Sequence, residues 1–170
     1  MRVGLTIVTT LAAGALIAAC GTDDQPPEET TEAKAASTKA DPCAPGDLTA
    51  AVTESPAPDD EDKLFLLTFT AADSTTSCYL SGPPQAMVFR DAADAELPVT
   101  VRTDPGGTPR KVLVNADLQA EAYLTTPVAG ADTAAVRTDF TMSSGTTFSL
   151  DWPSPVGYAV TVTPVTKPGS

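Results

Sequence analysis

The stretch LFLLTFT, residues 64–70, decides the fold class of this 170-residue chain. It is apolar on both faces at its start and then alternates apolar and polar positions, which predicts a central β-strand. The same period-two alternation recurs over residues 97–102, 148–153 and 158–163, between clusters of Pro, Gly and Asp. These repeated patterns predict an all-β domain.

Further strand candidates lie at residues 47–53, 86–90, 111–115 and 118–125, and no long stretch shows a helical apolar stripe. Seven to nine short strands over residues 43–166 fit a two-sheet sandwich. No internal repeat is present, so we expect one domain, followed by a short tail over residues 167–170.

The first 19 residues have the composition of a secretory signal peptide. Arg2 precedes an apolar run that ends in small residues. The run is shorter than the roughly 20 residues of a membrane span, and no basic stop-transfer cluster follows it. The alternative is an N-terminal anchor helix that is never cleaved.

Residues 17–20, Ile-Ala-Ala-Cys, resemble the bacterial lipoprotein signature. That resemblance implies that the Cys20 thiol receives a diacylglycerol and that Cys20 becomes the new N-terminus. Acyl chains such as palmitate contribute about 0.8 kcal/mol per buried methylene and hold a protein durably on a bilayer. We therefore expect a lipid anchor on the extracytoplasmic side of the cell membrane. The alternative is a cysteine that merely ends a signal peptide.

Residues 20–42 follow as an acidic, proline-rich segment. After Cys20 they contain no aromatic residue and no Val, Leu, Ile or Met, so they are expected to form a disordered tether. The whole chain has a formal net charge of −12, which argues against nucleic-acid binding. The sequence also shows no basic cluster that would press the domain against anionic lipid.

The remaining cysteines are Cys43 and Cys78. Outside the cytoplasm such an even remainder indicates a disulfide, which would stabilise the fold by roughly 4 kcal/mol. A reactive thiol is the alternative, although the chain has neither a CxxC pair nor a histidine.

The stretch CYLSGPP, residues 78–84, resembles the C-x-L-x-G-x-P core of a family of actinobacterial secreted lipoproteins of unknown function. The earlier Cys43 followed by Asp47 and Leu48 also matches that family. The resemblance implies an immunoglobulin-like sandwich and brings no site residues with it. Physically, Gly82 permits a positive φ and Leu80 is expected to point inward beside the disulfide. We expect this stretch to form a corner that only supports the fold. The alternative is a corner that recognises a peptide.

Catalytic and metal-binding patterns are scarce. The chain has no histidine and no GxSxG, SxxK or phosphate-loop motif, so we expect no cofactor and no catalytic site. The densest carboxylate cluster, residues 59–62, is expected to be a solvated turn, with weak cation binding as the alternative. Met87 and Met142 are expected to fill the core rather than to bind copper.

Aromatic side chains mark a candidate binding surface made of Trp152, Tyr158 and Tyr79. Trp152 has a second interpretation as the plug of the sandwich core, which we favour. The sequence thus predicts a non-catalytic interaction module for an envelope protein or polymer. A carboxylate-dependent envelope enzyme and a passive structural lipoprotein are the alternatives.

Overall fold

Eleven strands and no helix make up the part of the chain that the computed structural model describes, residues 40–130 and 132–169. The strands are β1 (Asp41–Pro42), β2 (Leu48–Ser55), β3 (Asp62–Ala71), β4 (Ser77–Leu80), β5 (Gln85–Arg90), β6 (Thr100–Thr103), β7 (Val112–Asn115), β8 (Ala120–Pro127), β9 (Arg137–Thr141), β10 (Thr147–Asp151) and β11 (Ala159–Val162). The predicted signal peptide, Cys20 and the tether up to residue 39 lie outside the described residues. No helix among the described residues is long and apolar enough to cross a membrane.

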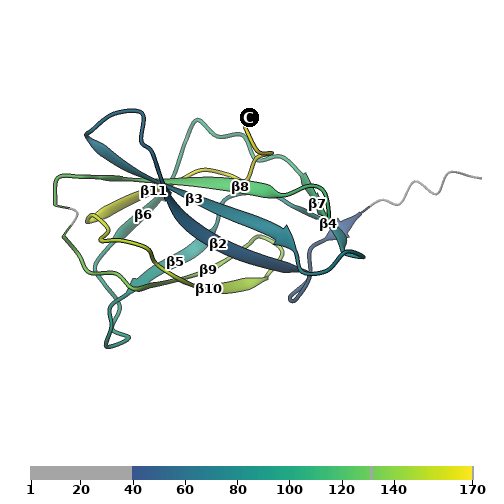
Figure 1. Ribbon diagram of the computed structural model, residues 1–170, viewed down its shortest axis with the longest axis horizontal. Coiled ribbons are helices and arrows are strands. Elements are labelled where there is room, and N and C mark those ends of the chain that lie inside the picture. The colour runs from purple at the N-terminus through teal and green to yellow at the C-terminus, as the bar shows by residue number, and fades with distance from the viewer. Residues whose placement is uncertain (1–39, 131, 170) are drawn as a thin grey trace, which may run out of the picture. The chain divides into compact units, whose positions relative to one another are not determined.

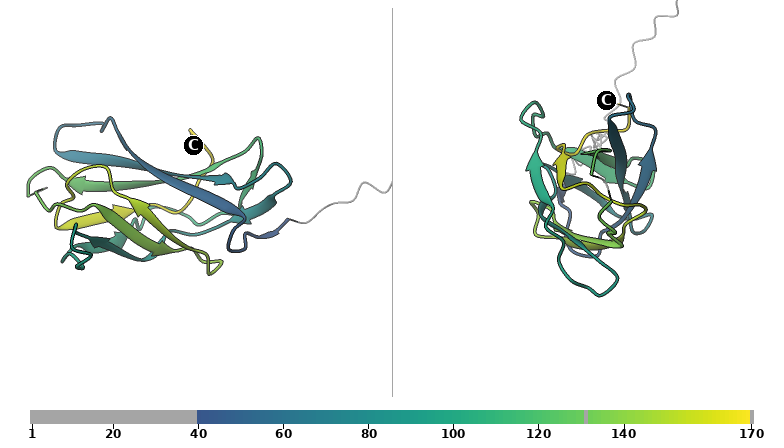
Figure 2. Two further views of the ribbon diagram at one scale, coloured as in Figure 1. Left: turned by 60° about the horizontal axis from the view of Figure 1, so that its bottom comes forward. Right: turned by 90° about the vertical axis from the view of Figure 1, so that its left-hand side faces the viewer.

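The strands form a sandwich-like arrangement. One layer is a five-stranded sheet in the order β2-β3-β8-β11-β6, and two three-stranded sheets, β10-β9-β5 and β1-β4-β7, complete the fold. Pairing is antiparallel except between β1 and β4 and between β11 and β6. Figure 1 shows β5, β9 and β10 beneath the five-stranded sheet and β4 and β7 at one end, and Figure 2 gives two further views of the layers. The all-β prediction is therefore confirmed, while the immunoglobulin-like connectivity stays a prediction.

Strand β3 contains the LFLLTFT stretch and is a central strand, as predicted. Its residues 64–71 pair with β2 along one edge, and its residues 62–69 pair with β8 along the other. Its alternating Phe65, Leu67 and Phe69 are at most 1% exposed and point into the core. The half-buried Leu64 and Leu66 lie on the other face, which explains the apolar start of the stretch.

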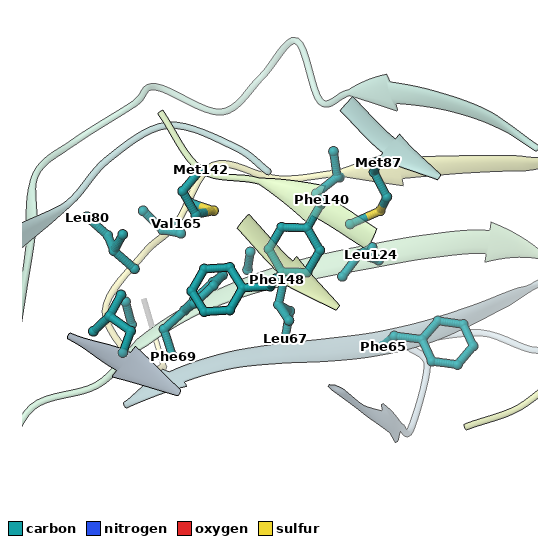
Figure 3. Packing of buried hydrophobic residues seen from close by; sticks show 14 of the residues in the cluster. Phe65, Leu67, Phe69, Leu80, Met87, Leu124, Phe140, Met142, Phe148 and Val165 are labelled. Atoms are coloured by element: carbon teal, nitrogen blue, oxygen red, sulfur yellow. The ribbon is translucent and has the colours of Figure 1, made fainter. Parts of the chain in front are cut away.

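The core is built from aromatic rings contributed by both layers (Figure 3). Phe69 lies edge-on to Phe140 and Phe148, with ring centroids 6.2 and 5.5 Å apart. Met87 and Met142 are buried in the same cluster, in agreement with their predicted role as core fillers. Burying an aromatic or aliphatic side chain of this size contributes about 1.5–3 kcal/mol, so this cluster carries much of the stability.

The predicted disulfide joins Cys43 to Cys78, with Cα atoms 4.9 Å apart. Both cysteines are buried, and Leu80 points inward beside them at 1% exposure, as expected. The amide of Cys43 donates to the carbonyl of Tyr79, which continues the pairing of β1 with β4. The last two residues of the predicted tether thus belong to β1.

Gly82 turns the chain between two of the sheets. It has a φ of +75°, a left-handed conformation that favours glycine, as its place in the motif predicted. Its carbonyl accepts a hydrogen bond of 3.1 Å from the amide of Val165. The motif is therefore a structural corner that leads from β4 through Pro83 and Pro84 into β5.

Some expectations about strands are corrected. The described residues hold eleven strands rather than seven to nine, because β1, β4 and β9 were not predicted from the pattern. The strand expected at 97–102 begins only at Thr100, since the Leu97 amide donates to the Phe89 carbonyl and this segment crosses between the layers. Tyr158 does not share the buried face of Val160 and Val162, because β11 begins after it, at Ala159.

Candidate functional site

Trp152 is a core residue and does not belong to an exposed surface. Its side chain is 5% exposed, and its ring centroid lies 4.4 Å from that of Phe65 and 4.8 Å from that of Phe89. The interpretation of Trp152 as the plug of the sandwich is correct, and its place in the candidate binding surface is wrong. The physical reason is that β10 ends at Asp151 and the chain then turns inward over Phe65.

The structure does not join the two tyrosines into one site. Tyr158 is 63% exposed and lies against the turn at Gly130, just before β11. Tyr79 lies in β4, opposite Pro42 on one side and Leu113 on the other. Tyr79 has serine hydroxyls and the ammonium group of Lys111 around it.

The acidic residues 59–62 form a hydrogen-bonded turn. One carboxylate oxygen of Asp59 accepts the backbone amides of Glu61 and Asp62, at 3.1 and 3.2 Å. Within residues 40–130 and 132–169, no group of three His, Cys, Asp or Glu side chains is arranged to hold a metal ion.

The outer face of the β1-β4-β7 sheet carries a short row of side chains made of Pro42, Tyr79 and Leu113. Leu113 is 36% exposed, although it is a large apolar residue. The ammonium group of Lys111 lies 4.2 Å from the centre of the Tyr79 ring, within the range of a cation–π contact. Tyr79 lines one hollow of the surface and Lys111 lines another, so the contact between these two side chains connects the hollows.

The first hollow is lined by hydroxyl groups. It has a volume of about 450 Å³ and is bounded by Pro42, Tyr79, Ser81, Ser143 and Ser144. The Ser143 hydroxyl donates to the Ser81 carbonyl at 2.6 Å, which fixes the two walls to each other. An aromatic ring beside several hydroxyls is a surface suited to a polar, ring-shaped ligand.

The second hollow is cationic. It has a volume of about 480 Å³, and its polar walls are Thr108, Arg110, Lys111, Thr166 and Lys167. The C-terminal wall is held in place because Thr166 and Glu121 exchange two backbone hydrogen bonds, of 2.9 and 2.7 Å. The basic residues of this hollow are not contiguous in the sequence, because Lys167 is distant from Arg110 and Lys111 along the chain.

The positive charge of this hollow is not neutralised by ion pairs at Arg110 and Lys111. Neither residue forms a salt bridge to a carboxylate in the described part of the chain. The nearby carboxylate of Asp104 accepts the Gly106 amide at 2.8 Å, and that of Glu121 accepts Gln119 and Tyr123. A hollow lined by several positively charged side chains concentrates ions of the opposite sign.

Arg90 and Arg137, on the β5-β9-β10 sheet, differ from Arg110 and Lys111 because they form ion pairs. Arg90 binds Asp139 at 2.7 Å, and Arg137 binds Asp94. A hydrogen bond from Ser149, followed by that from Arg90, lowers the pKa of Asp139 below its ordinary value. These charges are already paired within the protein, so this network serves the fold.

One signal for the cationic hollow was present in the sequence. Arg110 and Lys111 are the only adjacent pair of basic residues in a chain with 10 Lys and Arg against 22 Asp and Glu. Lys167 lies 56 positions further on, and the pairing of Thr166 with Glu121 holds its segment beside them.

No family model, no curated protein and no solved structure matches this chain. The surface that extends from Tyr79 to Lys111, Arg110 and Lys167 is the candidate site.

Proposed function

We propose that this protein is a lipid-anchored binding module of the bacterial envelope, non-catalytic and displayed on the extracytoplasmic side of the membrane. Its ligand is an anionic envelope polymer, held by the joined surface of Tyr79, Lys111, Arg110 and the neighbouring hydroxyls. The observation that carries the proposal is a cationic hollow without compensating ion pairs at Arg110 and Lys111, in a chain of net charge −12.

Three features of the chain support a location on the extracytoplasmic side of the membrane. The first 19 residues have the pattern of a signal peptide, and residues 17–20 resemble the lipoprotein signature. The Cys43–Cys78 disulfide is a bond typical of oxidising compartments outside the cytoplasm. The CYLSGPP motif resembles that of secreted lipoproteins and agrees with the same location.

The chemistry of the surface supports an anionic glycan more than a lipid headgroup layer. Arg and Lys bind phosphate or carboxylate groups through charge-assisted hydrogen bonds. Tyr79 and the serines of the adjoining hollow add an aromatic ring and hydroxyls that suit sugar rings. A flat anionic membrane would instead meet the many carboxylates of the domain and be repelled.

The proposal is tested by co-sedimentation of the purified full chain with insoluble cell-wall polymer from the producing bacterium, with its anionic side polymers intact or removed. Arg110→Glu combined with Lys111→Glu should weaken binding at least 10-fold, and Tyr79→Ala should weaken it several-fold. Lys63→Glu, a charge reversal on β3 away from both hollows, should leave binding within about 2-fold.

Removing the anionic side polymers should abolish binding, and added salt should weaken it because the attraction is screened. Unchanged binding by the Arg110→Glu/Lys111→Glu variant would contradict the proposal. So would binding to vesicles of anionic phospholipid that equals or exceeds binding to the polymer.

A further inference from the structure

The two sides of the sandwich differ in how their edges are closed. On one side, the segment between β5 and β6 crosses from one layer to the other and covers the seam, with Leu97 and Val99 packed against the core. On the other side, β2 and β10 are the edge strands of their sheets and lie next to each other. At this second seam the surface is hollowed between the two strands.

The free edge of strand β2 can form backbone hydrogen bonds with a further strand. It is eight residues long and pairs without irregularity with β3 alone. In an antiparallel pair every second residue directs its backbone N–H and C=O away from the partner, so half of β2 presents unpaired groups to the outside. Such an edge is a template for another chain.

The other edge strands are shorter than β2, as β7 and β10 with four and five residues are, or they also carry protective features. Strand β1 has only two residues and contains Pro42, β6 has four and contains Arg102, and β5 is interrupted by an irregularity at Ala86, whose φ is +48°. Strand β2, with the sequence LTAAVTES, contains no Pro, Lys, Arg or bulge. Its edge is thus the longest regular one among the described residues.

The seam beside β2 also leaves inward-facing apolar residues partly exposed. A hollow of about 370 Å³ is lined by Ala50, Ala51, Val52, Ser149, Leu150 and Asp151. Ala50, Val52 and Leu150 pack against the core yet are only partly buried. Apolar side chains of an added strand would fill this hollow and cover these three residues.

The charge around the seam is negative. Asp47 precedes β2, Glu54 lies near its end, and the acidic turn at residues 59–62 follows, whereas no Lys or Arg occurs between residues 40 and 62. Asp151 contributes a carboxylate from the β10 side, and residues 141–166 contain no Lys or Arg either. A positively charged segment fits this edge, and a second copy of the acidic chain is repelled.

We propose that the β2 edge is a second binding site, which takes up an extended, positively charged polypeptide segment of an envelope protein as an additional strand. Its backbone pairs with β2, its alternate apolar side chains fill the hollow toward β10, and its positive charge is attracted by the carboxylates gathered around this edge. This site is separate from the Tyr79–Lys111 surface and does not depend on the polymer-binding proposal.

The test uses an eight-residue capped peptide of strictly alternating Lys and Val, with a peptide of the same composition in blocks of two as control. Hydrogen exchange of the full chain, followed by mass spectrometry, should show that alternate β2 amides exchange rapidly in the free protein. The alternating peptide should slow them at least 10-fold and leave the β6 edge unchanged, whereas the block peptide should have little effect.

Two variants of β2 separate edge pairing from general attraction. Val52→Lys introduces a charge into the hollow, and Thr53→Lys introduces the same charge on the solvent face at the next position. The first should weaken peptide binding at least 10-fold and the second less than about 3-fold. Hydrogen exchange of the unmodified chain supplies the test independently if Val52→Lys does not fold.

Equal binding of the two peptides would overturn the proposal, as would peptide binding that leaves β2 exchange unchanged. Absence of binding by the alternating peptide would do the same. Protection of β2 that rises with protein concentration and without peptide would identify a second copy of the chain as the occupant, and would also overturn it.

Discussion

Asp139 shows how single residues on the β5-β9-β10 sheet are stabilised by charge. Its carboxylate accepts hydrogen bonds from Ser149 at 2.6 Å and from Arg90 at 2.7 Å. These bonds favour the ionised form, and so the pKa of Asp139 in the folded protein lies below that of an unfolded aspartate. The contribution to stability is present above about pH 5 and is lost as the pH falls through the folded-state pKa.

We therefore predict that Asp139→Asn lowers the free energy of unfolding at pH 7 and has a smaller effect near pH 3. The reason is that near pH 3 the aspartate of the unfolded chain is already largely protonated, so the preference of the folded state for the ionised carboxylate stabilises the protein less. Urea unfolding followed by circular dichroism at both values measures this difference. Asp60→Asn, in the exposed acidic turn, is the matched control and should leave the free energy of unfolding unchanged at both pH 7 and pH 3. An equal loss of stability at pH 7 and pH 3 would contradict the role given to Asp139.

At the scale of elements, the strand β3 organises the domain because it is paired along both edges and its inner face meets the aromatic cluster. We predict that Phe69→Ala destabilises the protein by about 3–5 kcal/mol, since Phe69 is fully buried and contacts two other rings. Leu66→Ala, on the half-buried outer face of the same strand, should cost clearly less. Denaturant unfolding of the two variants measures the difference, and similar costs would show that the faces of β3 are assigned wrongly.

The strands that the sequence predicted are those whose apolar residues alternate. Residues 64–70, 111–115 and 118–125 lie in or next to β3, β7 and β8 for this reason. Strand β9, with the sequence RTDFT, was missed because its inner face includes a threonine. Thr138 is 1% exposed, and its hydroxyl donates to the Val88 carbonyl, so that a polar residue takes a core position. Hydropathy alone carries no signal for such a satisfied hydroxyl.

The candidate site was less accessible to sequence reasoning than the fold. Tyr79 was identified as an aromatic residue for binding, but Trp152 was grouped with it and lies in the core. The cationic hollow combines Arg110 and Lys111 with Lys167, and long-range pairing alone brings these residues to one place. Residue type indicates what a side chain can bind, whereas the register between distant segments decides which side chains share a surface.

At the scale of the whole molecule, the proposed function requires the domain to be held at the membrane. We predict that Cys20→Ser abolishes metabolic labelling with palmitate and releases the protein, or leaves its signal peptide uncut, because the thiol that receives the lipid is lost. Labelling of the producing cells followed by fractionation of the membrane measures both effects. A Cys43→Ser/Cys78→Ser double variant tests whether any labelling comes from the other cysteines. Undiminished labelling of Cys20→Ser would remove the lipid anchor from the account.

The central claim is that ligand binding occurs at the surface joining Tyr79 to the cationic hollow. The most direct measurement is an NMR titration of the isotopically labelled full chain, in detergent, with soluble phosphate-bearing fragments of the cell-wall polymer. We predict saturable shifts of the amide signals of Tyr79, Lys111 and Thr166, and an unchanged indole signal of the buried Trp152. Shifts confined to the 59–62 turn or to Tyr158, or no shifts at the highest fragment concentration, would contradict the claim.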